Sequence, residues 1–345
     1  HNYSFFGSAK VGILLPFNNK KHIDFVRKKN YLGAPPKSDL IKAHFLIINT
    51  KKPTTMNRIF YFLFAIALIS CKNEKKLTDE EKRWQQHADN VEIIRDDFGV
   101  PHIYGKTDAD AVFGLLYAQC EDDFNRVERN YIWAIGRLAE VEGEASLYSD
   151  LRARLYMTKE EAIENYNNSP QWLKDLCNAF ADGVNYYLKT HPEVKPKLLT
   201  RFEPWMPMYF SEGSIGGDIE RVSTRKIKDF YNPSENTDVA INDGLIRLKD
   251  DEPRGSNGFA ISGDKTKSGD AMLLINPHTS FYFRGEVHVV SEEGLNAYGA
   301  VTWGQFFVYQ GFNEKTGWMH TSTGTDMIDE FEETIVVEDD KTSYR

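Results

Sequence analysis

Apolar and polar positions follow two different patterns along this chain, one before residue 255 and another after it. Between residues 90 and 190 the apolar residues recur every three or four positions, which is the period of an amphipathic helix. Two short strands are expected first, at 91–95 and 102–104. The helical period then predicts helices at 108–118, 121–136, 158–165 and 170–188. Four prolines then interrupt the pattern and predict an irregular segment: Pro192, Pro196, Pro204 and Pro207.

After residue 255 the apolar residues come in short runs, separated by Gly, Asp and Asn, as is typical of strands and turns. The expected strands are 258–262, 271–275, 286–291, 295–301 and 334–337. Helices that precede strands in this way indicate the α+β fold class, with Ser256 expected at the end of a central sheet.

A separate apolar run lies nearer the N-terminus. Eleven apolar residues, 59–69, follow the charged start Met56-Asn57-Arg58 and end at Ser70-Cys71. A charged start, a short apolar core and a small-residue exit are typical of a secretory signal, and eleven residues are too few to span a bilayer. Leu68-Ile69-Ser70-Cys71 resembles a bacterial lipobox, in which the cysteine is lipidated. The resemblance implies a periplasmic or surface lipoprotein of the bacterial cell envelope, anchored to the membrane at Cys71; a buried helix is the alternative.

The first 55 residues differ from the rest in charge. They carry ten Lys or Arg against two Asp or Glu, whereas the whole chain has a net charge of −9. A basic nucleic-acid-binding arm is one interpretation. We favour translated upstream sequence, with Met56 as the natural start, because a signal placed 55 residues into a protein is poorly placed to work.

Composition narrows the class of protein. With 41% apolar and 13% aromatic residues the chain can bury a sizeable core. The chain after residue 55 is acidic, and its negative charge argues against a nucleic-acid partner. The three cysteines form no disulfide framework: Cys71 has the lipid role, and Cys120 and Cys177 are either buried thiols or a pair.

The stretch Gly255-Ser256-Asn257-Gly258-Phe259 carries the strongest chemical signal. A serine hydroxyl needs a base, and a free α-amine, whose ordinary pKa is about 7.7 to 8.0, can serve. Cleavage of the Gly255–Ser256 bond would therefore create a nucleophile and its base on one residue. The glycine allows the strained turn from which the hydroxyl attacks its preceding carbonyl. A loop that leads into a strand is the alternative interpretation of this stretch.

Further motifs, in order, resemble those of the penicillin acylase family of N-terminal-nucleophile amidohydrolases, which includes penicillin, cephalosporin and acyl-homoserine-lactone acylases. Those similar to the family's β-subunit are Ser256-Asn257-Gly258-Phe259, Asn276-Pro277-His278, Trp318-Met319-His320-Thr321-Ser322 and Asp326-Met327-Ile328-Asp329. Those similar to its α-subunit are the stretch from Val91 to Tyr104, Tyr117-Ala118-Gln119-Cys120-Glu121-Asp122, Gly136-Arg137-Leu138-Ala139-Glu140 and Ala181-Asp182-Gly183-Val184-Asn185.

The resemblance implies an Ntn-hydrolase αββα sandwich that is only partly present. It divides the chain into five segments: 1–55 upstream translation, 56–71 lipoprotein signal, 72–90 tether, 91–255 α-subunit-like region and 256–345 first part of a β-subunit. Two subunits cut from one precursor would form a heterodimer. Because family members run further past the serine, we expect these 345 residues to be a fragment.

Matching positions carry the family's catalytic roles. The resemblance implies that Ser256 is the nucleophile, that His278 supports its α-amine and that the backbone N–H of Ser322 forms half of an oxyanion hole. The other half, an asparagine in the family, falls beyond Arg345. A strand-end histidine and a polar loop residue are the ordinary interpretations of His278 and Ser322.

The resemblance also implies a structural calcium ion and no organic cofactor. Asp326, the carbonyl of Ile328 and Asp329 match the family's β-subunit ligands, and Glu220 is the candidate from the α-subunit. Oxygen ligands suit calcium, although an Asp-x-x-Asp pair is more often solvated charge.

The expected activity is the hydrolysis of a linear amide between an acyl group and an amine, through an acyl-enzyme on Ser256. Deacylation of homoserine lactones is one alternative, and an inert surface lipoprotein with the same fold is another. Phe281, Trp303 and Phe306 are candidates for an acyl pocket, although such aromatic residues are more often core. The acyl group and the amine of the substrate stay open.

Overall fold

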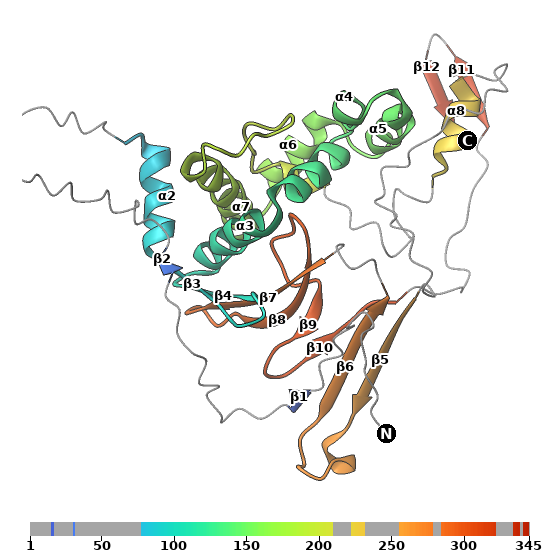
Figure 1. The fold of residues 1–345 in the computed structure, drawn as a ribbon. Helices are drawn as coiled ribbons and strands as arrows, with labels where there is room; N and C mark the ends of the chain where they lie inside the picture. The colour runs from blue at the N-terminus through green and yellow to red at the C-terminus, as the bar shows by residue number, and fades with distance from the viewer. Residues whose placement is uncertain are drawn as a thin grey trace, which may run out of the picture.

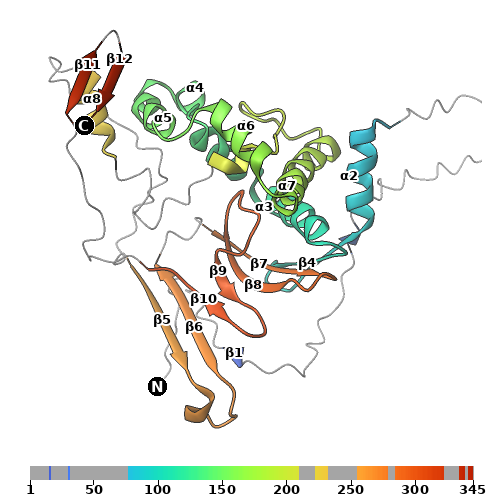
Figure 2. The same ribbon diagram turned by 180° about the vertical axis from the view of Figure 1, so that it is seen from behind.

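The computed structural model describes residues 77–209, 222–231, 255–278, 284–321, 334–338 and 341–344, together with two short strands near the N-terminus. Helices and strands lie in separate layers: a group of helices covers one face of a sheet, and a long hairpin extends away from the helices (Figures 1 and 2). The predicted α+β class is confirmed, with helices preceding most of the strands along the chain.

Seven α-helices lie within the described ranges. They are α2 (Asp79–Asp89), α3 (Asp108–Ala134), α4 (Ala139–Glu142), α5 (Leu147–Arg154), α6 (Lys159–Asn168), α7 (Gln171–Thr190) and α8 (Thr224–Tyr231). Three begin at a threonine whose hydroxyl accepts the N–H of the third helical residue, while that residue's carboxylate accepts the threonine N–H: Thr78, Thr107 and Thr158. This reciprocal cap satisfies two backbone donors that a helix start leaves unpaired.

The main sheet combines strands from both halves of the chain. Its order is β10-β9-β8-β7-β4-β3-β2. The strands are β2 (Asn30–Tyr31), β3 (Val91–Arg95), β4 (Pro101–Gly105), β7 (Arg284–Ser291), β8 (Asn296–Thr302), β9 (Gln310–Phe312) and β10 (Gly317–Trp318). Neighbours pair antiparallel except β4 and β7, which run parallel with His102 opposite His288. The junction between the two halves of the chain therefore lies inside one sheet.

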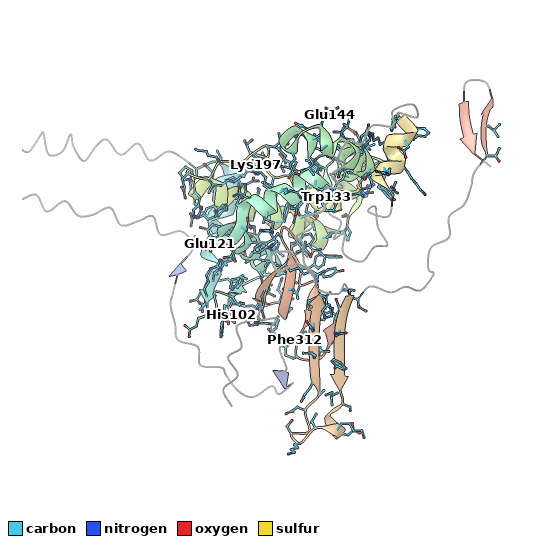
Figure 3. All side chains as sticks on the ribbon, turned by 45° about the vertical axis from the view of Figure 1, so that its right-hand side comes forward. His102, Glu121, Trp133, Glu144, Lys197 and Phe312 are labelled. Atoms are coloured by element: carbon cyan, nitrogen blue, oxygen red, sulfur yellow. The ribbon has the colours of Figure 1, made fainter. Side chains whose placement is uncertain are left out.

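A second, smaller sheet has the order β1-β6-β5. It consists of β1 (Leu15–Pro16), β5 (Gly255–Ile261) and β6 (Met272–His278). A short hairpin, β11 (Ile335–Glu338) with β12 (Lys341–Tyr344), forms a third. In Figure 3 the side chain of Trp133 lies among the helices, whereas Phe312 lies at the sheet near the β5–β6 hairpin.

The core lies between the main sheet and the helices, around α3. Phe113, Tyr131 and Phe180 are fully buried there, and the rings of Tyr131 and Phe180 lie 4.9 Å apart. Helix α7 packs closely on α3 because Gly183 has no side chain: an ideal Cβ there would lie only 2.5 Å from the carbonyl oxygen of Phe113. Burial of one such aromatic side chain stabilises a fold by roughly 1.5 to 3 kcal/mol.

A buried carboxylate fixes the irregular segment that follows α7. Glu128, on α3, is fully buried and accepts backbone N–H groups from residues 197, 198 and 199 at 3.0, 2.8 and 2.9 Å. Three donors around one carboxylate replace the water that burial removes. The segment rich in proline is thereby held to the core.

Two buried amides act in a similar way. Gln119 donates to the carbonyl of Gln305 and accepts the N–H of Gly304, both at 2.8 Å, which fixes the turn after β8 against α3. Asn185 donates to the carbonyl of Phe202 and accepts its N–H, at 2.8 and 2.9 Å. Both amides belong to motifs that carried the family resemblance. In the structure both hold a loop to a helix.

The predicted tether at 72–90 is wrong in its second part. Residues 79–89 form α2, whose Trp84 and Ala88 are buried against the core. Arg83 donates two hydrogen bonds to the buried carboxylate of Asp182, at 2.5 and 2.7 Å, and Trp84 donates a third at 2.7 Å. A charged helix is thus held to α7 by a buried acid.

Membrane-spanning segments were sought in the same residues. Within the described ranges no helix combines the length and the apolar character that crossing a bilayer requires.

Candidate active site

Ser256 is the second residue of β5, at the end of the hairpin where β5 begins. The register with β6 places Gly255 opposite His278 and Ser256 opposite Pro277. The bond between Gly255 and Ser256 therefore lies across the strand pair from the Pro277–His278 bond. Turn residues at 263–270, which join the two strands, lie at the far end of the hairpin.

His278 contacts the serine through its backbone. Its N–H donates to Oγ of Ser256 at 3.4 Å, whereas its Nε2 lies 3.3 Å from the amide nitrogen of Asn257. An amide nitrogen is a donor only, so Nε2 of the ring is the acceptor in this contact. The structure thus brings Ser256 and His278 together, with Asn257 orienting the ring.

A third residue reaches the serine from a distant part of the chain. The hydroxyl of Thr321 donates to the carbonyl oxygen of Ser256 at 3.0 Å. Beside it Met319 packs on Gly258, where an ideal Cβ would lie 1.9 Å from the methionine sulfur. The absence of a side chain at Gly258 therefore lets the chain at 319–321 pass directly over β5.

The same segment is tied to the main sheet. Gln310, in β9, donates to the carbonyl of His320 at 3.2 Å, and the rings of Tyr309 and His320 lie 4.6 Å apart. Trp318 donates from its indole to the carbonyl of Val308 at 3.2 Å. Through residues 318–321 the position of Ser256 is thus coupled to the seven-stranded sheet.

The arrangement suits a serine nucleophile whose base is not the histidine ring. Oγ of Ser256 accepts a hydrogen bond from a backbone N–H, which would stabilise negative charge as it develops on that oxygen. The imidazole of His278 faces Asn257 instead. A released α-amine on Ser256 would lie on the same residue as the hydroxyl and needs no further positioning.

Seven predicted site residues lie outside the described residues. They are Cys71, Glu220, Phe281, Ser322, Asp326, Ile328 and Asp329. Among the residues that are described, no group of three or more His, Cys, Asp or Glu could hold a metal ion. The calcium and oxyanion-hole predictions therefore stay predictions.

The two remaining pocket candidates belong to the helical side of the sheet. Trp303 and Phe306 pack against the core, and Phe306 also lines a cavity of about 180 Å³. The other walls of that cavity include Tyr131 of α3 and Cys177 of α7. These aromatic residues thus lie with the core helices, and their part in an acyl pocket stays a prediction.

Cys120 and Cys177 are both free thiols. Burial raises the pKa of Cys120 well above its usual value and that of Cys177 to about 11, so both remain protonated at neutral pH. They contribute apolar volume to the core, and the alternative that they pair is excluded by the structure.

Thr321 and Asn257 are the contacts that the sequence did not single out. Both stand inside motifs that carried the family resemblance, next to Ser322 and Ser256. The motifs were therefore the available signal, although only the three-dimensional packing shows which of their side chains reach the serine.

Comparisons with known proteins agree on one family. Residues 90–345 match the family model described as Penicillin amidase. The acyl-homoserine lactone acylase QuiP of Pseudomonas fluorescens (strain Pf0-1) is 28% identical over 294 residues, covering 72% of this chain and 36% of the relative. The acyl-homoserine lactone acylase PvdQ of the same strain is 24% identical over 257 residues, covering 67% and 33%. The chain spans about a third of the length of these curated relatives.

A solved structure, a thermostable penicillin G acylase from Alcaligenes faecalis, is also similar to part of the chain. It shows 20% sequence identity with a TM-score of 0.34, and the match covers 47% of this chain and 97% of that one.

Proposed function

The chain belongs to the penicillin amidase family, and from this premise we propose that it is an N-terminal-nucleophile hydrolase of linear amides with Ser256 as its nucleophile. One observation supports the proposal most directly. Ser256 is the second residue of β5, its Oγ accepts the N–H of His278, and its carbonyl oxygen accepts the hydroxyl of Thr321. One contact holds the reacting hydroxyl of Ser256 and the other holds its backbone carbonyl.

Activation would begin with attack of Oγ of Ser256 on the carbonyl carbon of Gly255. The C–N bond between the two residues breaks as the C–O bond forms, and the nitrogen takes up the hydroxyl proton. Water then hydrolyses the resulting ester, which leaves a carboxylate on Gly255 and a free α-amine on Ser256. The two products would form an α/β heterodimer, since strands from both sides of the bond share one sheet.

Turnover would repeat this chemistry on a substrate. The α-amine accepts the proton of Oγ as it attacks the acyl carbon, and the resulting ammonium protonates the leaving amine. Water then releases the acid from the acyl-enzyme. Because the amine must be neutral to act as a base, activity should rise with pH through its ordinary pKa of about 7.7 to 8.0.

N-terminal sequencing with intact mass, on the full-length protein, tests the proposal. A second chain beginning Ser-Asn-Gly-Phe is expected. A single uncut chain without amidase activity would instead favour an inert lipoprotein that keeps the fold.

Thr321 supplies a sharper test of the geometry. Thr321→Val removes the hydrogen bond to the Ser256 carbonyl and keeps the side-chain shape, so kcat should fall about tenfold. Thr266→Val is the matched control, because Thr266 makes similar hydrogen bonds at the far end of the hairpin. Equal kcat values for the two variants would remove Thr321 from this role.

Acyl-homoserine lactones are the second candidate substrate class, and the names of the relatives favour them. Their amide joins a fatty acyl group to an amine, so the chemistry at Ser256 would be unchanged. A panel of N-acyl homoserine lactones of different chain length, set beside phenylacetyl and glutaryl amides, would distinguish the two candidates by kcat/KM.

We also propose that the protein is anchored to the bacterial cell envelope by a lipid on Cys71, as the lipobox-like motif indicates. Cys71→Ser should move the protein from the membrane fraction to the soluble fraction. Cys120→Ser, which alters a buried thiol, is the control.

A further inference from the structure

An open cavity of about 550 Å³ lies in the helical part of the molecule. Its walls come from the end of α3, the loop between α5 and α6, and the irregular segment between 198 and 209. Its volume lies within the range of sites that hold small molecules. Neither the serine hairpin nor residues 318–321 contribute to it.

Four cationic side chains and one carboxylate, Glu203, line this cavity. Two of the cations are neutralised within the protein. Arg201 is bonded to Glu80 and Glu203 at 2.7 and 2.9 Å, and Arg137 is bonded to Glu140 through two nitrogens at 2.5 and 2.6 Å.

The other two cations are Arg154 and Lys159. Nε and Nη2 of Arg154 both donate to the carbonyl of Gly136, at 3.2 and 2.8 Å, and Nζ of Lys159 lies 5.4 Å from the ring centroid of Trp205. In the part of the chain that is described, neither forms an ion pair with a carboxylate. Two positive charges thus face the cavity with a carbonyl and an aromatic ring as their direct contacts, while the carboxylates of Glu140 and Asp150 act on Arg154 at longer range.

The rest of the wall is largely apolar. Met157, Trp205 and Met206 line the cavity beside the two cations. Apolar character continues onto the surface, because Leu155 and Tyr156, on the same loop, are 62% and 54% exposed. Exposed apolar side chains next to cations suit a ligand that has an anionic head and an apolar body.

We propose that this cavity binds an amphiphilic anion, whose carboxylate or phosphate head pairs with Arg154 and Lys159 and whose alkyl chain lies against Trp205 and Met206. The head gains charge-assisted hydrogen bonds, and the chain gains apolar contact that water does not provide. A free single-chain acid and a phospholipid of a membrane share this chemistry. The site is independent of the chemistry at Ser256.

Calorimetric titration of the full-length protein with decanoate, below its micelle concentration, tests the proposal. Saturable binding is expected, with a change in tryptophan fluorescence that Trp205→Phe removes. Arg154→Gln with Lys159→Gln should weaken binding by about tenfold or more. The matched control, Lys174→Gln with Lys195→Gln, removes two exposed charges outside the cavity and should leave the Kd unchanged.

A second variant protects the test against misfolding. Thr200→Trp adds bulk at an exposed position of the wall and retains all four cations, so it should also weaken decanoate binding. Thermal unfolding of each variant shows whether it remains folded. Equal binding of decanoate by the unmodified and doubly substituted proteins, or equal binding of decyltrimethylammonium, would overturn the proposal.

Vesicles distinguish the two sources of the ligand. Binding to phosphatidylglycerol vesicles but not to phosphatidylcholine vesicles, lost in the double variant, would identify the ligand as a membrane lipid. Binding to decanoate with no vesicle binding would identify it as a free acid. Absence of binding to either would refute the inference.

Discussion

Helix α3 with its partners and the β5–β6 hairpin are stabilised in different ways. Around α3, fully buried aromatic rings pack together, and buried side chains such as Glu128 and Gln119 are fully engaged with backbone groups. On the hairpin, every residue of β6 is half-buried, and Phe259 is 59% exposed. The helical region is stabilised by close packing of buried side chains. The hairpin is held by fewer contacts: residues 319–321 near Ser256, and β1 and Gly317 near Leu273.

This difference separates stability from chemistry. A change in the α3 region should act on folding, and a change at the start of β5 should act on reaction rate with little effect on folding. Thr321 and Met319 contact the hairpin, and His320 between them is hydrogen-bonded to β9 of the main sheet. The segment 319–321 therefore connects the hairpin to the sheet on which the helices pack.

The largest expected effect is on rate. Ser256→Ala removes the nucleophile, so amide hydrolysis should fall by at least about a thousandfold. Because this variant would also keep the Gly255–Ser256 bond intact, its fold is compared through secondary structure, which should be unchanged. Steady-state kinetics and far-ultraviolet circular dichroism measure the two quantities. Ser268→Ala, at the hairpin turn, is the control; residual turnover of Ser256→Ala near that of the control would contradict the assignment.

The largest expected effect on stability lies in the other region. Glu128→Gln replaces a buried carboxylate by an amide whose nitrogen would face backbone N–H donors, which should lower the free energy of unfolding by about 3 kcal/mol. Urea unfolding checks this. Glu164→Gln, at an exposed position of α6, should cost less than about 0.5 kcal/mol. A similar cost for both would mean that the segment at 197–199 does not depend on Glu128.

Substitution of one glycine in each region, Gly183 in α7 and Gly258 in β5, compares how tightly the two regions are packed. A methyl group at Gly183 would meet the backbone of Phe113, which cannot move without shifting α3, so Gly183→Ala should cost about 2 kcal/mol. A methyl group at Gly258 would meet the side chain of Met319, which can rotate away, so Gly258→Ala should cost less than about 1 kcal/mol. Thermal unfolding of both variants measures this difference. A larger cost at Gly258 would mean that the hairpin is held as tightly as the core.

The smallest effect should come from the hairpin surface. Phe259→Ser replaces an exposed aromatic side chain of β5 and should change the free energy of unfolding of the described fold by less than about 0.5 kcal/mol. Chemical denaturation followed by circular dichroism measures it. A loss above about 1 kcal/mol would indicate that this face of β5 is covered when the protein is folded.

The elements with regular apolar spacing could be predicted from the sequence. The strand expected at 91–95 is β3, and the helix expected at 170–188 is α7, two residues longer at its end. The two helices expected at 108–118 and 121–136 both correspond to parts of α3, which consists of two helical segments joined by a kink at Asp123. Their burial follows from the sequence because their inward positions are apolar.

Elements held by buried polar groups escaped prediction. Helix α2 has only two buried residues, and its main attachment is to Asp182, about a hundred positions further along the chain. Asp150, on α5, accepts the N–H groups of Leu138 and Ala139 from the interior, and burial raises its pKa. In the sequence such charged residues look like exposed surface residues, because the hydrogen-bond partners that compensate their burial are far away along the chain.

Part of the candidate site could be predicted from family motifs, and the rest is visible only in the three-dimensional structure. The motifs indicated Ser256 and His278, and the strand register brings both together. Thr321 contacts the serine across 65 positions of sequence, which no local pattern reveals. Roles assigned to residues outside the described ranges stay predictions.

The parallel pairing of β4 with β7 has a consequence for reversibility. These strands lie on opposite sides of the Gly255–Ser256 bond, and Asn130 and Tyr131 also bond to residues 303 and 304 across it. While that bond is intact, the sheet assembles by a unimolecular reaction. Once it is cut, reassembly after denaturation requires two chains to meet, so recovery should depend on protein concentration. In dilute solution, unfolding of the cleaved protein would therefore be effectively irreversible, because the two separated chains rarely meet.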